Sequence, residues 1–262
     1  MEKILFISDI HLDAEEPERI GQFIRFLEFA QTERVTLYIL GDLFNFWAGN
    51  AQAWLGTIRK LVRALKLFHA QGRLFFLDGN RDFLYAPYWQ QQGGHTLTEG
   101  TLLCLSRDYP TDVALVEPAH RTLTDVSVML YHGDTLFTAD VKYQRLRALL
   151  RQRWIYWAAR LLPASVCLSI GRKLRLMSQR EVSRKSDAEM ALDYRYIRNI
   201  LEESDADVMI CGHRHHEEVV DIPLAHKQAK LYVLPENRGL QLRYLLWDQG
   251  TFTFYNYPCH SD

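Results

Sequence analysis

Seven side chains that can ligate metal ions lie in five short blocks along the chain. The blocks span residues 9–11, 41–42, 79–82, 132–134 and 212–215. Carboxylates, imidazoles and an amide oxygen suit manganese, iron or zinc, whereas a soft-metal site would need thiolates. Two adjacent divalent cations held by such ligands can activate a water molecule and polarise a phosphoryl group. The candidate ligands are Asp9, His11, Asp42, Asn80, His132, His213 and His215, with Asp42 as the natural bridge between two cations.

No single block is specific. A lone Asp-x-His or Gly-Asp is more often a turn with a capping carboxylate than a metal site. Five blocks in this order, each at the end of a predicted strand, are hard to produce by chance. Asp82 and Asp134 are interpreted as residues that orient metal ligands, and Trp47 as a core residue. His216 is the alternative to His215 as the last ligand.

The elements around the first three blocks alternate between short apolar runs and amphipathic stretches. We expect strands at residues 3–8, 35–40 and 73–78 and helices at 17–31 and 51–71, which is a β-α-β-α-β series. Apolar runs at 126–131 and 207–211 predict two further strands. Chemistry gathers at the carboxyl ends of such strands. We therefore expect all five blocks to meet at one edge of one sheet.

Composition indicates an ordinary globular protein. The chain has 262 residues, 48% of them hydrophobic, and a formal net charge of -1, so it has no global bias toward nucleic acid. The apolar run from Ile4 to Ile7 is too short for a signal peptide, which predicts a cytoplasmic protein. Four cysteines lie far apart, without the spacing of a zinc site, and we expect reduced, mostly buried thiols.

One segment concentrates the basic charge. Residues 142–185 contain twelve Lys and Arg against one acid, Glu181, a formal charge of +11. Apolar stretches at 154–163 and 166–170 lie inside it, interrupted by Arg160 and Pro163, so a membrane-spanning helix is excluded. An interfacial or acyl-binding helical hairpin fits better, because basic residues beside an apolar face favour anionic headgroups. A hairpin that only packs on the domain remains an alternative. A nucleic-acid surface ranks lower, because the aromatic residues cluster with aliphatic ones.

The five blocks resemble the pattern of the calcineurin-like metallophosphoesterase superfamily, which is D-x-H, G-D, G-N-[HR]-[DE], a later H and G-H-x-H. The resemblance extends from Asp9 to His215. It implies a four-layer α/β/β/α sandwich and two divalent metal ions. One ion would be held by Asp9, His11, Asp42 and His215, and the other by Asp42, Asn80, His132 and His213. Arg81 stands where many members have a histidine; it cannot act as a general acid but can neutralise phosphate charge.

Wider stretches narrow the resemblance. Residues 38–44, 79–84 and 132–136, with Trp47 and the pair Asp140 and Tyr143, are similar to the UDP-2,3-diacylglucosamine pyrophosphatase family of lipid A biosynthesis. This implies manganese-dependent hydrolysis of UDP-2,3-diacylglucosamine to UMP and 2,3-diacylglucosamine 1-phosphate. Asn80, Arg81 and His213 would stabilise charge during the reaction. The implied substrate contacts are Asn80, Arg81, Asp140, Tyr143, Arg175, Ser178, Lys185 and His213.

The same resemblance implies the domain organisation and the location. Residues 1–139 and 187–262 would form the core, and residues 140–186 a lipid-binding helical cap. The protein would contact an anionic membrane surface, on the cytoplasmic face of the inner membrane, and no nucleic acid. The sequence leaves the oligomeric state open.

Some stretches depart from the family and bear on the substrate rather than on the metal chemistry. Arg214 separates the last two ligands, where the family commonly has Thr. The segment at residues 105–125 is longer than usual and could act as a lid or as a contact for a partner. Residues 234–238 replace an expected Trp-containing stretch, and Gln179 and Val182 replace Lys and Asn. Two alternatives therefore stay open: a phosphodiesterase or phosphatase acting on a soluble ester, and a non-catalytic scaffold of the same fold.

Overall fold

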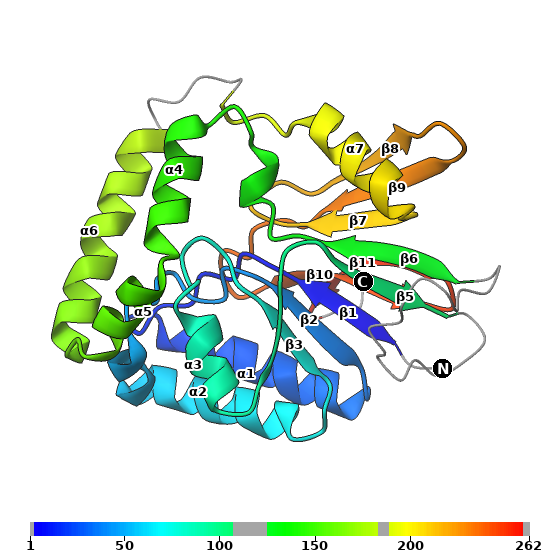
Figure 1. The fold of residues 1–262 in the computed structure, drawn as a ribbon. Helices are drawn as coiled ribbons and strands as arrows, with labels where there is room; N and C mark the ends of the chain where they lie inside the picture. The colour runs from blue at the N-terminus through cyan, green and yellow to red at the C-terminus, as the bar shows by residue number, and fades with distance from the viewer. Residues whose placement is uncertain (1–2, 107–124, 183–188, 259–262) are drawn as a thin grey trace.

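The computed structural model describes residues 3–106, 125–182 and 189–258, and it contains two β-sheets. The first sheet has the strand order β11-β10-β1-β2-β3-β4, and the second has the order β5-β6-β7-β9-β8 (Figure 1). The strands of the first sheet are β1 (Ile4–Ile7), β2 (Thr36–Leu40), β3 (Leu74–Leu77), β4 (His95–Leu97), β10 (Leu242–Asp248) and β11 (Thr251–Tyr257). Those of the second are β5 (Thr101–Leu105), β6 (Val126–Leu130), β7 (Val208–Cys211), β8 (Glu218–Pro223) and β9 (Gln228–Val233).

The predicted β-α-β-α-β series is confirmed in the first sheet. Strands β1 to β4 run parallel, and helices α1 (Pro17–Thr32), α2 (Gly56–His69) and α3 (Tyr85–Gln91) lie between them in sequence. The helix expected at residues 51–71 divides into a 3-10 helix at Asn50–Trp54 and α2. Leu55 causes the break, because its backbone is extended (φ −64°, ψ 139°) and cannot continue a helix.

The expectation that all five blocks lie on one sheet is wrong. Strands β6 and β7, which precede the fourth and fifth blocks, pair in parallel with each other in the second sheet. The sequence suggested one sheet because a short strand that is buried on both faces has the same apolar residue pattern whichever sheet it joins. The blocks still meet, because the carboxyl ends of the parallel strands in both sheets point to the same side of the molecule (Figure 1).

The four-layer arrangement predicted by the resemblance is confirmed. Side chains alternate along each strand, so Ile4 and Phe6 face the second sheet and pack with Val128 and Ile210, whereas Leu5 and Ile7 pack with the outer helices. Helices α1 and α2 cover the first sheet, and α7 (Tyr194–Ser204) covers the second. Trp47 is fully buried in the outer core, in agreement with its interpretation as a core residue.

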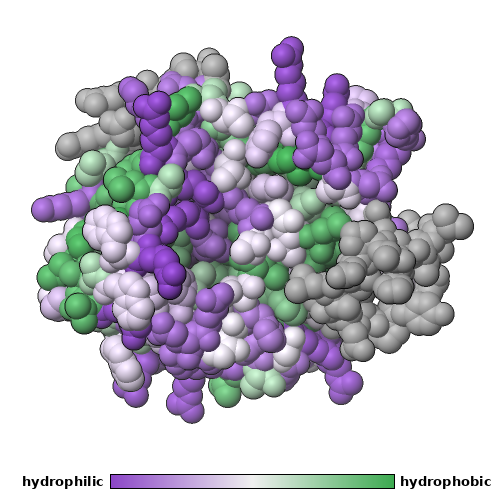
Figure 2. All heavy atoms as spheres, viewed as in Figure 1, coloured by the Kyte–Doolittle hydropathy of each residue, from purple (hydrophilic) through white to green (hydrophobic). Residues whose placement is uncertain are grey.

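Helices α4 (Val141–Leu150), α5 (Arg153–Arg160) and α6 (Ala164–Val182), hereafter the inserted helices, lie between the fourth block and α7. They stand on one flank of the sandwich (Figure 1). They pack on the core in part, since Ala159 and Cys167 are buried. In contrast, Trp154 is 63% and Leu161 86% exposed. Figure 2 shows hydrophobic side chains beside strongly hydrophilic ones on this flank. Whether residues 140–186 act as a lipid-binding cap stays a prediction.

No helix in the described part of the chain has both the length and the apolar character needed to cross a bilayer. Cys104, Cys167 and Cys211 are free thiols, and the latter two are buried, in agreement with the expectation of reduced cysteines. The fourth, Cys259, and most of the long segment at 105–125 lie outside the described residues.

Candidate metal centre

The loops that follow β1, β2, β3, β6 and β7 carry the seven predicted ligands, and several of these residues have unusual backbone geometry. Asp9, His11 and Asp42 have φ of 52°, and His213 and His215 have φ of 66° and 63°. Positive φ is uncommon for residues other than glycine and costs about 1–3 kcal/mol at each position. Five of the eight non-glycine residues with positive φ in the described part of the chain lie at this edge, and such a concentration is typical of a functional site, because the surrounding structure must hold the strain in place.

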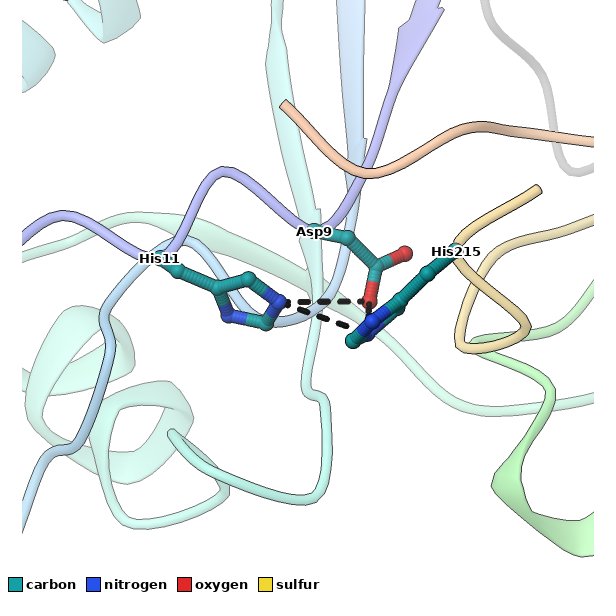
Figure 3. A group of neighbouring side chains, drawn as sticks. All are labelled: Asp9, His11 and His215. Carbon is teal, nitrogen blue, oxygen red and sulfur yellow. Dashed lines mark hydrogen bonds and ion pairs between the residues drawn. The ribbon is translucent and has the colours of Figure 1, made fainter. Parts of the chain in front are cut away.

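The first group of ligands consists of Asp9, His11 and His215, which point toward one another (Figure 3). The Nε2 atom of His215 lies 3.2 Å from Asp9 Oδ1 and 3.4 Å from His11 Nε2. The Nε2 atom of His11 lies 3.8 Å from the same Asp9 oxygen. Three ligand atoms at these separations from two strand-end loops can surround one cation.

The second group lies on the other side of Asp42. Asn80 Oδ1 is 3.1 Å from His132 Nε2 and 3.0 Å from His213 Nδ1. Asp42 separates the two groups, since its Oδ2 lies 3.8 Å from His11 Nδ1 and its Oδ1 lies 3.8 Å from His132 Nε2. The structure therefore brings all seven predicted residues together, with Asp42 between the groups as a bridging carboxylate would be. Asp9 is also near both groups, because it forms a second possible cluster with Asp42 and His132.

Two buried carboxylate oxygens suit cations rather than protein donors. Asp9 Oδ1 and Asp42 Oδ2 are buried and form no hydrogen bond of good geometry with a described residue, and their nearest protein contacts are His215 Nε2 at 3.2 Å and Arg81 Nε at 3.4 Å. A buried polar atom without a partner costs free energy, so native proteins nearly always satisfy it. Divalent cations would satisfy both oxygens, and the mixed oxygen and nitrogen ligand set suits metals such as manganese, iron or zinc.

Hydrogen bonds from neighbouring groups fix the orientation of the ligands. Asp9 Oδ2 accepts from the Ser8 hydroxyl at 2.6 Å and from the His213 amide at 2.8 Å. His132 Nδ1 lies 2.9 Å from the Leu40 carbonyl, so Nδ1 carries the proton and Nε2 is free to face the site. The bonds from the His213 amide and to the Leu40 carbonyl run between the two sheets, so they also hold the two halves of the site together.

Asp82 fixes the backbone of two ligand loops. Its Oδ1 accepts from the amides of Asp42 at 3.2 Å and Gly79 at 3.0 Å, and its Oδ2 accepts from the Phe44 amide at 3.2 Å. The side chain is fully buried. Asp82 therefore acts on the position of the ligands through the main chain, in agreement with its interpretation from the sequence.

Gly41 allows the loops to approach closely. Its φ is +89°, and a Cβ at this position would lie 2.5 Å from His132 Nδ1 and 2.7 Å from Gly79 Cα. Any larger residue would push the His132 loop away from the Asp42 loop.

Burial and neighbouring charges set the protonation of the histidines. Burial lowers the pKa of His132, but the carboxylates of Asp42, Asp9 and Asp134 outweigh it and raise that pKa to about 9. Burial and the charge of His132 lower the pKa of His213 to about 3, so its imidazole is neutral near pH 7. The excess of negative charge that holds a proton on His132 would equally attract a cation.

Arg81 lies beside the centre. Its Nε is 3.4 Å from Asp42 Oδ2, and its guanidinium donates to Asn45 Oδ1 at 3.2 Å. About a quarter of its side chain is exposed, so part of the guanidinium faces solvent. Arg214, by contrast, forms an ion pair with Glu218. The charge of Arg214, the residue that departs from the family, is therefore paired with the first residue of β8.

Helix α4 is attached to ligand loops of both sheets. Arg147 contacts Asp134 Oδ2 and Glu99 Oε2, each at 2.7 Å, and the Tyr143 hydroxyl donates to Asp134 Oδ2 at 2.5 Å. At its other end Arg151 forms an ion pair with Asp78 and donates to the Gly79 carbonyl at 3.2 Å. These contacts place the start of the inserted helices beside the centre.

The predicted substrate contacts are only partly described. Asp140 is 3% exposed, and its Oδ1 caps α4 by accepting from the Tyr143 amide at 3.1 Å. The Tyr143 ring stacks on His213, with ring centres 6.4 Å apart. The side chains of Arg175 and Ser178, and all of Lys185, lie outside the described residues. The roles of these residues in substrate binding stay predictions.

The sequence reasoning did not identify Glu236. Its Oε1 lies 3.5 Å from His11 Nε2, and its Oε2 lies 3.4 Å from His215 Nδ1. Glu236 follows β9, which pairs in parallel with β7, so the end of β9 lies at the same edge as the loop that carries His213 and His215.

Comparison with known proteins gives a consistent result. The family model for calcineurin-like phosphoesterases matches residues 2–217. Proteins named UDP-2,3-diacylglucosamine hydrolase are 35% identical over 88% of this chain in Shewanella pealeana, and 36% identical over 85% in Photorhabdus laumondii. A protein of the same name from Tolumonas auensis is 31% identical over 98% of this chain. The matches cover 89%, 86% and 98% of those relatives.

Proposed function

Because the chain belongs to the calcineurin-like phosphoesterase family, whose members use divalent metals, and is a hydrolase, we propose that it cleaves the pyrophosphate of UDP-2,3-diacylglucosamine. The products would be UMP and 2,3-diacylglucosamine 1-phosphate, in the lipid A pathway. The observation that carries this proposal is the position of Asp42 between two groups of ligands that face opposite oxygens of its carboxylate. The names of the relatives support the choice of substrate.

We propose that the residues present hold two divalent ions, Mn²⁺ in each case. Asp9, His11, Asp42 and His215 would hold one, and Asp42, Asn80, His132 and His213 the other. When bound, such ions supply Lewis acidity to phosphoryl oxygens and lower the pKa of a water molecule.

The chain's own side chains would orient the substrate and balance its charge. The partly exposed side chain of Arg81 can neutralise a phosphate oxygen, but a guanidinium cannot donate a proton to the leaving group. The imidazole of His213, neutral near pH 7, and the amide of Asn80 lie in contact and would stabilise developing charge at the same oxygens.

The inserted helices support a lipid-linked substrate. Arg160 lies over the Trp157 ring at 4.9 Å, and Trp157 itself is 57% exposed. Trp154 and Leu161 extend the apolar surface. Basic groups beside exposed aromatic residues favour an anionic membrane interface, by about 1 kcal/mol per charge. We propose peripheral contact with such a membrane, on its cytoplasmic face, with residues 140–186 as the lipid-binding cap.

Asp140, Tyr143, Arg175, Ser178 and Lys185 are the proposed substrate contacts of this cap. The position of α4, attached beside the centre through Arg147 and Arg151, supports the first two. They would bind the substrate while the metal ligands hold its pyrophosphate.

A substrate comparison tests the proposal. Manganese-loaded protein is incubated with UDP-2,3-diacylglucosamine and, separately, with the soluble diester bis(4-nitrophenyl) phosphate. We expect rapid release of UMP from the first and at least about 100-fold slower cleavage of the second, because the diester lacks every group the inserted helices would bind. Cleavage of the diester without release of UMP would contradict the proposed substrate but not the proposed metal centre.

A further inference from the structure

Glu236 occupies the edge of the metal centre although it lies outside the predicted ligand set. Its side chain is only 11% exposed, and its two oxygens face two different ligand histidines, at 3.5 Å from His11 Nε2 and 3.4 Å from His215 Nδ1. A buried carboxylate that contacts two histidines at once is placed by the fold, since a flexible surface acid would turn toward water.

The contact with His215 uses the ring nitrogen that does not face the centre. His215 Nε2 points toward Asp9 Oδ1 at 3.2 Å, whereas Nδ1 points toward Glu236 Oε2. An imidazole that ligates a metal through Nε2 carries its proton on Nδ1, and a carboxylate acceptor there fixes both the tautomer and the ring orientation. The geometry therefore matches a carboxylate, histidine and metal arranged in series.

Asn237 holds Glu236 in place. The Asn237 amide donates to the Asp9 carbonyl at 2.9 Å, and its side-chain amide donates to the Ser8 carbonyl at 3.0 Å. Its Oδ1 accepts from the Arg243 amide at 2.6 Å, and the residue is 2% exposed. The segment after β9 is thus attached to the loop that carries the first ligand, which fixes the position of Glu236 relative to Asp9.

Glu236 also pairs with Arg238, whose Nε lies 2.5 Å from Oε2. This pair offers a competing explanation, in which Glu236 only neutralises Arg238. The Arg238 side chain is 79% exposed, and exposed ion pairs contribute little. If the pair with Arg238 is the role of Glu236, Arg238→Gln should weaken metal binding as much as Glu236→Gln does. If Glu236 orients His215, Arg238→Gln should leave metal binding intact.

We propose that Glu236 is a positioning residue of the metal site formed by Asp9, His11 and His215. Its carboxylate accepts a hydrogen bond from the Nδ1–H group of His215, which directs Nε2 at the cation, and it adds negative charge beside His11. This inference rests on the metal centre of the proposed function but not on the identity of the substrate.

The test measures metal binding without turnover. Apo protein is titrated with Mn²⁺ by calorimetry for wild type, Glu236→Gln, Arg238→Gln and the matched control Glu217→Gln, and bound metal is counted after dialysis. Glu217 pairs with Arg243 and contacts no ligand histidine in the described structure. We expect Glu236→Gln to weaken one of the two sites by about 10- to 100-fold. Glu217→Gln and Arg238→Gln should bind as tightly as wild type or more tightly.

Apo-state melting temperatures of all four proteins separate folding from metal binding. Equal melting temperatures with weaker binding only in Glu236→Gln support the inference. Unchanged binding in Glu236→Gln, or an equal loss in Arg238→Gln, would overturn it while leaving the metal centre intact. Wild-type protein that binds no Mn²⁺ would overturn the metal centre and this inference together.

Discussion

The carboxylate of Asp82 holds the backbone of Asp42 in place, with 3.2 Å between Asp82 Oδ1 and the Asp42 amide nitrogen. Asp42 has a left-handed backbone, so its position depends on such external support. We expect Asp82→Ala to lower the free energy of unfolding by about 2 kcal/mol or more, because three buried amides lose their acceptor. Urea denaturation measures the change. A loss no larger than that of an exposed substitution such as Asp221→Ala would contradict the role assigned to Asp82.

Gly41 predicts a specific steric effect. A Cβ at residue 41 would meet His132 and Gly79, whereas a Cβ at Gly72, which has a similar φ of +73°, would meet open space. Gly72→Ala should therefore cost only about 1 kcal/mol for its backbone conformation. Gly41→Ala should cost more by at least about 2 kcal/mol and should lower Mn²⁺ affinity. Equal losses of stability in the two variants would show that the close approach of the loops is not required.

Arg147 connects α4 to two carboxylates beside the centre. Its removal in Arg147→Gln leaves Asp134, which is fully buried, and Glu99 without their cation. We expect a loss of about 2–4 kcal/mol in the free energy of unfolding, because a buried charge without a partner is costly. Arg145 is exposed on α4, so the control Arg145→Gln should change the free energy of unfolding very little. Chemical denaturation measures the free energy of unfolding of both variants. Similar values for Arg147→Gln and Arg145→Gln would show that Arg147 does not attach α4 to the core.

Asp193 predicts a pH dependence. The Thr138 hydroxyl, at 2.5 Å, and the amides of Tyr196 and Arg195 donate to its carboxylate at the start of α7, and they lower its pKa below the usual value. A lowered folded-state pKa gives stability that is present above the unfolded-state pKa and is lost as pH falls through the folded-state pKa.

Asp193→Ala should therefore destabilise by about 1 kcal/mol at pH 7, and the difference from wild type should shrink below about pH 4. Asp193→Asn keeps a capping oxygen and should lose less. Thermal melts from pH 3 to 7 provide the measurement. A difference between Asp193→Ala and wild type that stays constant across this range would contradict the assignment.

The exposed aromatic residues of α5 predict membrane contact. Replacing Trp154 and Trp157 with Ala should weaken binding to vesicles of anionic phospholipid several-fold, because both rings are more than half exposed. Tyr255→Ala, which removes an exposed aromatic side chain from β11, serves as the control. Co-sedimentation with vesicles measures the effect. Undiminished binding by the double variant would remove α5 from the proposed membrane surface.

The rule that ligands follow parallel strands identified all seven clustered residues from the sequence. Apolar runs such as 4–7 and 208–211 specify a buried strand and therefore locate the loop after it. They do not specify the sheet, because partner choice depends on contacts between residues far apart in sequence. For this reason the placement of His132 and His213 on the first sheet was wrong, while their convergence with Asp9 was right.

Glu236 was missed for a related reason. The sequence of residues 228–238 contains no histidine or Asp-x-His pattern, and the only sign was its departure from the family. Its contact with His215 arises because β9 lies beside β7, which no local pattern encodes. The break at Leu55 was also invisible, since an extended residue between two helical stretches does not disturb the apolar periodicity.

The most direct test of the central claim is the release of UMP from UDP-2,3-diacylglucosamine by wild-type and Asp42→Ala protein, each supplied with Mn²⁺. Asp42 contacts both groups of ligands, so its loss should remove both bound ions and lower the rate by at least about 1,000-fold, with the exposed substitution Asp221→Ala remaining at the wild-type rate. No release of UMP by the wild-type protein, or equal rates in wild type and Asp42→Ala, would contradict the account.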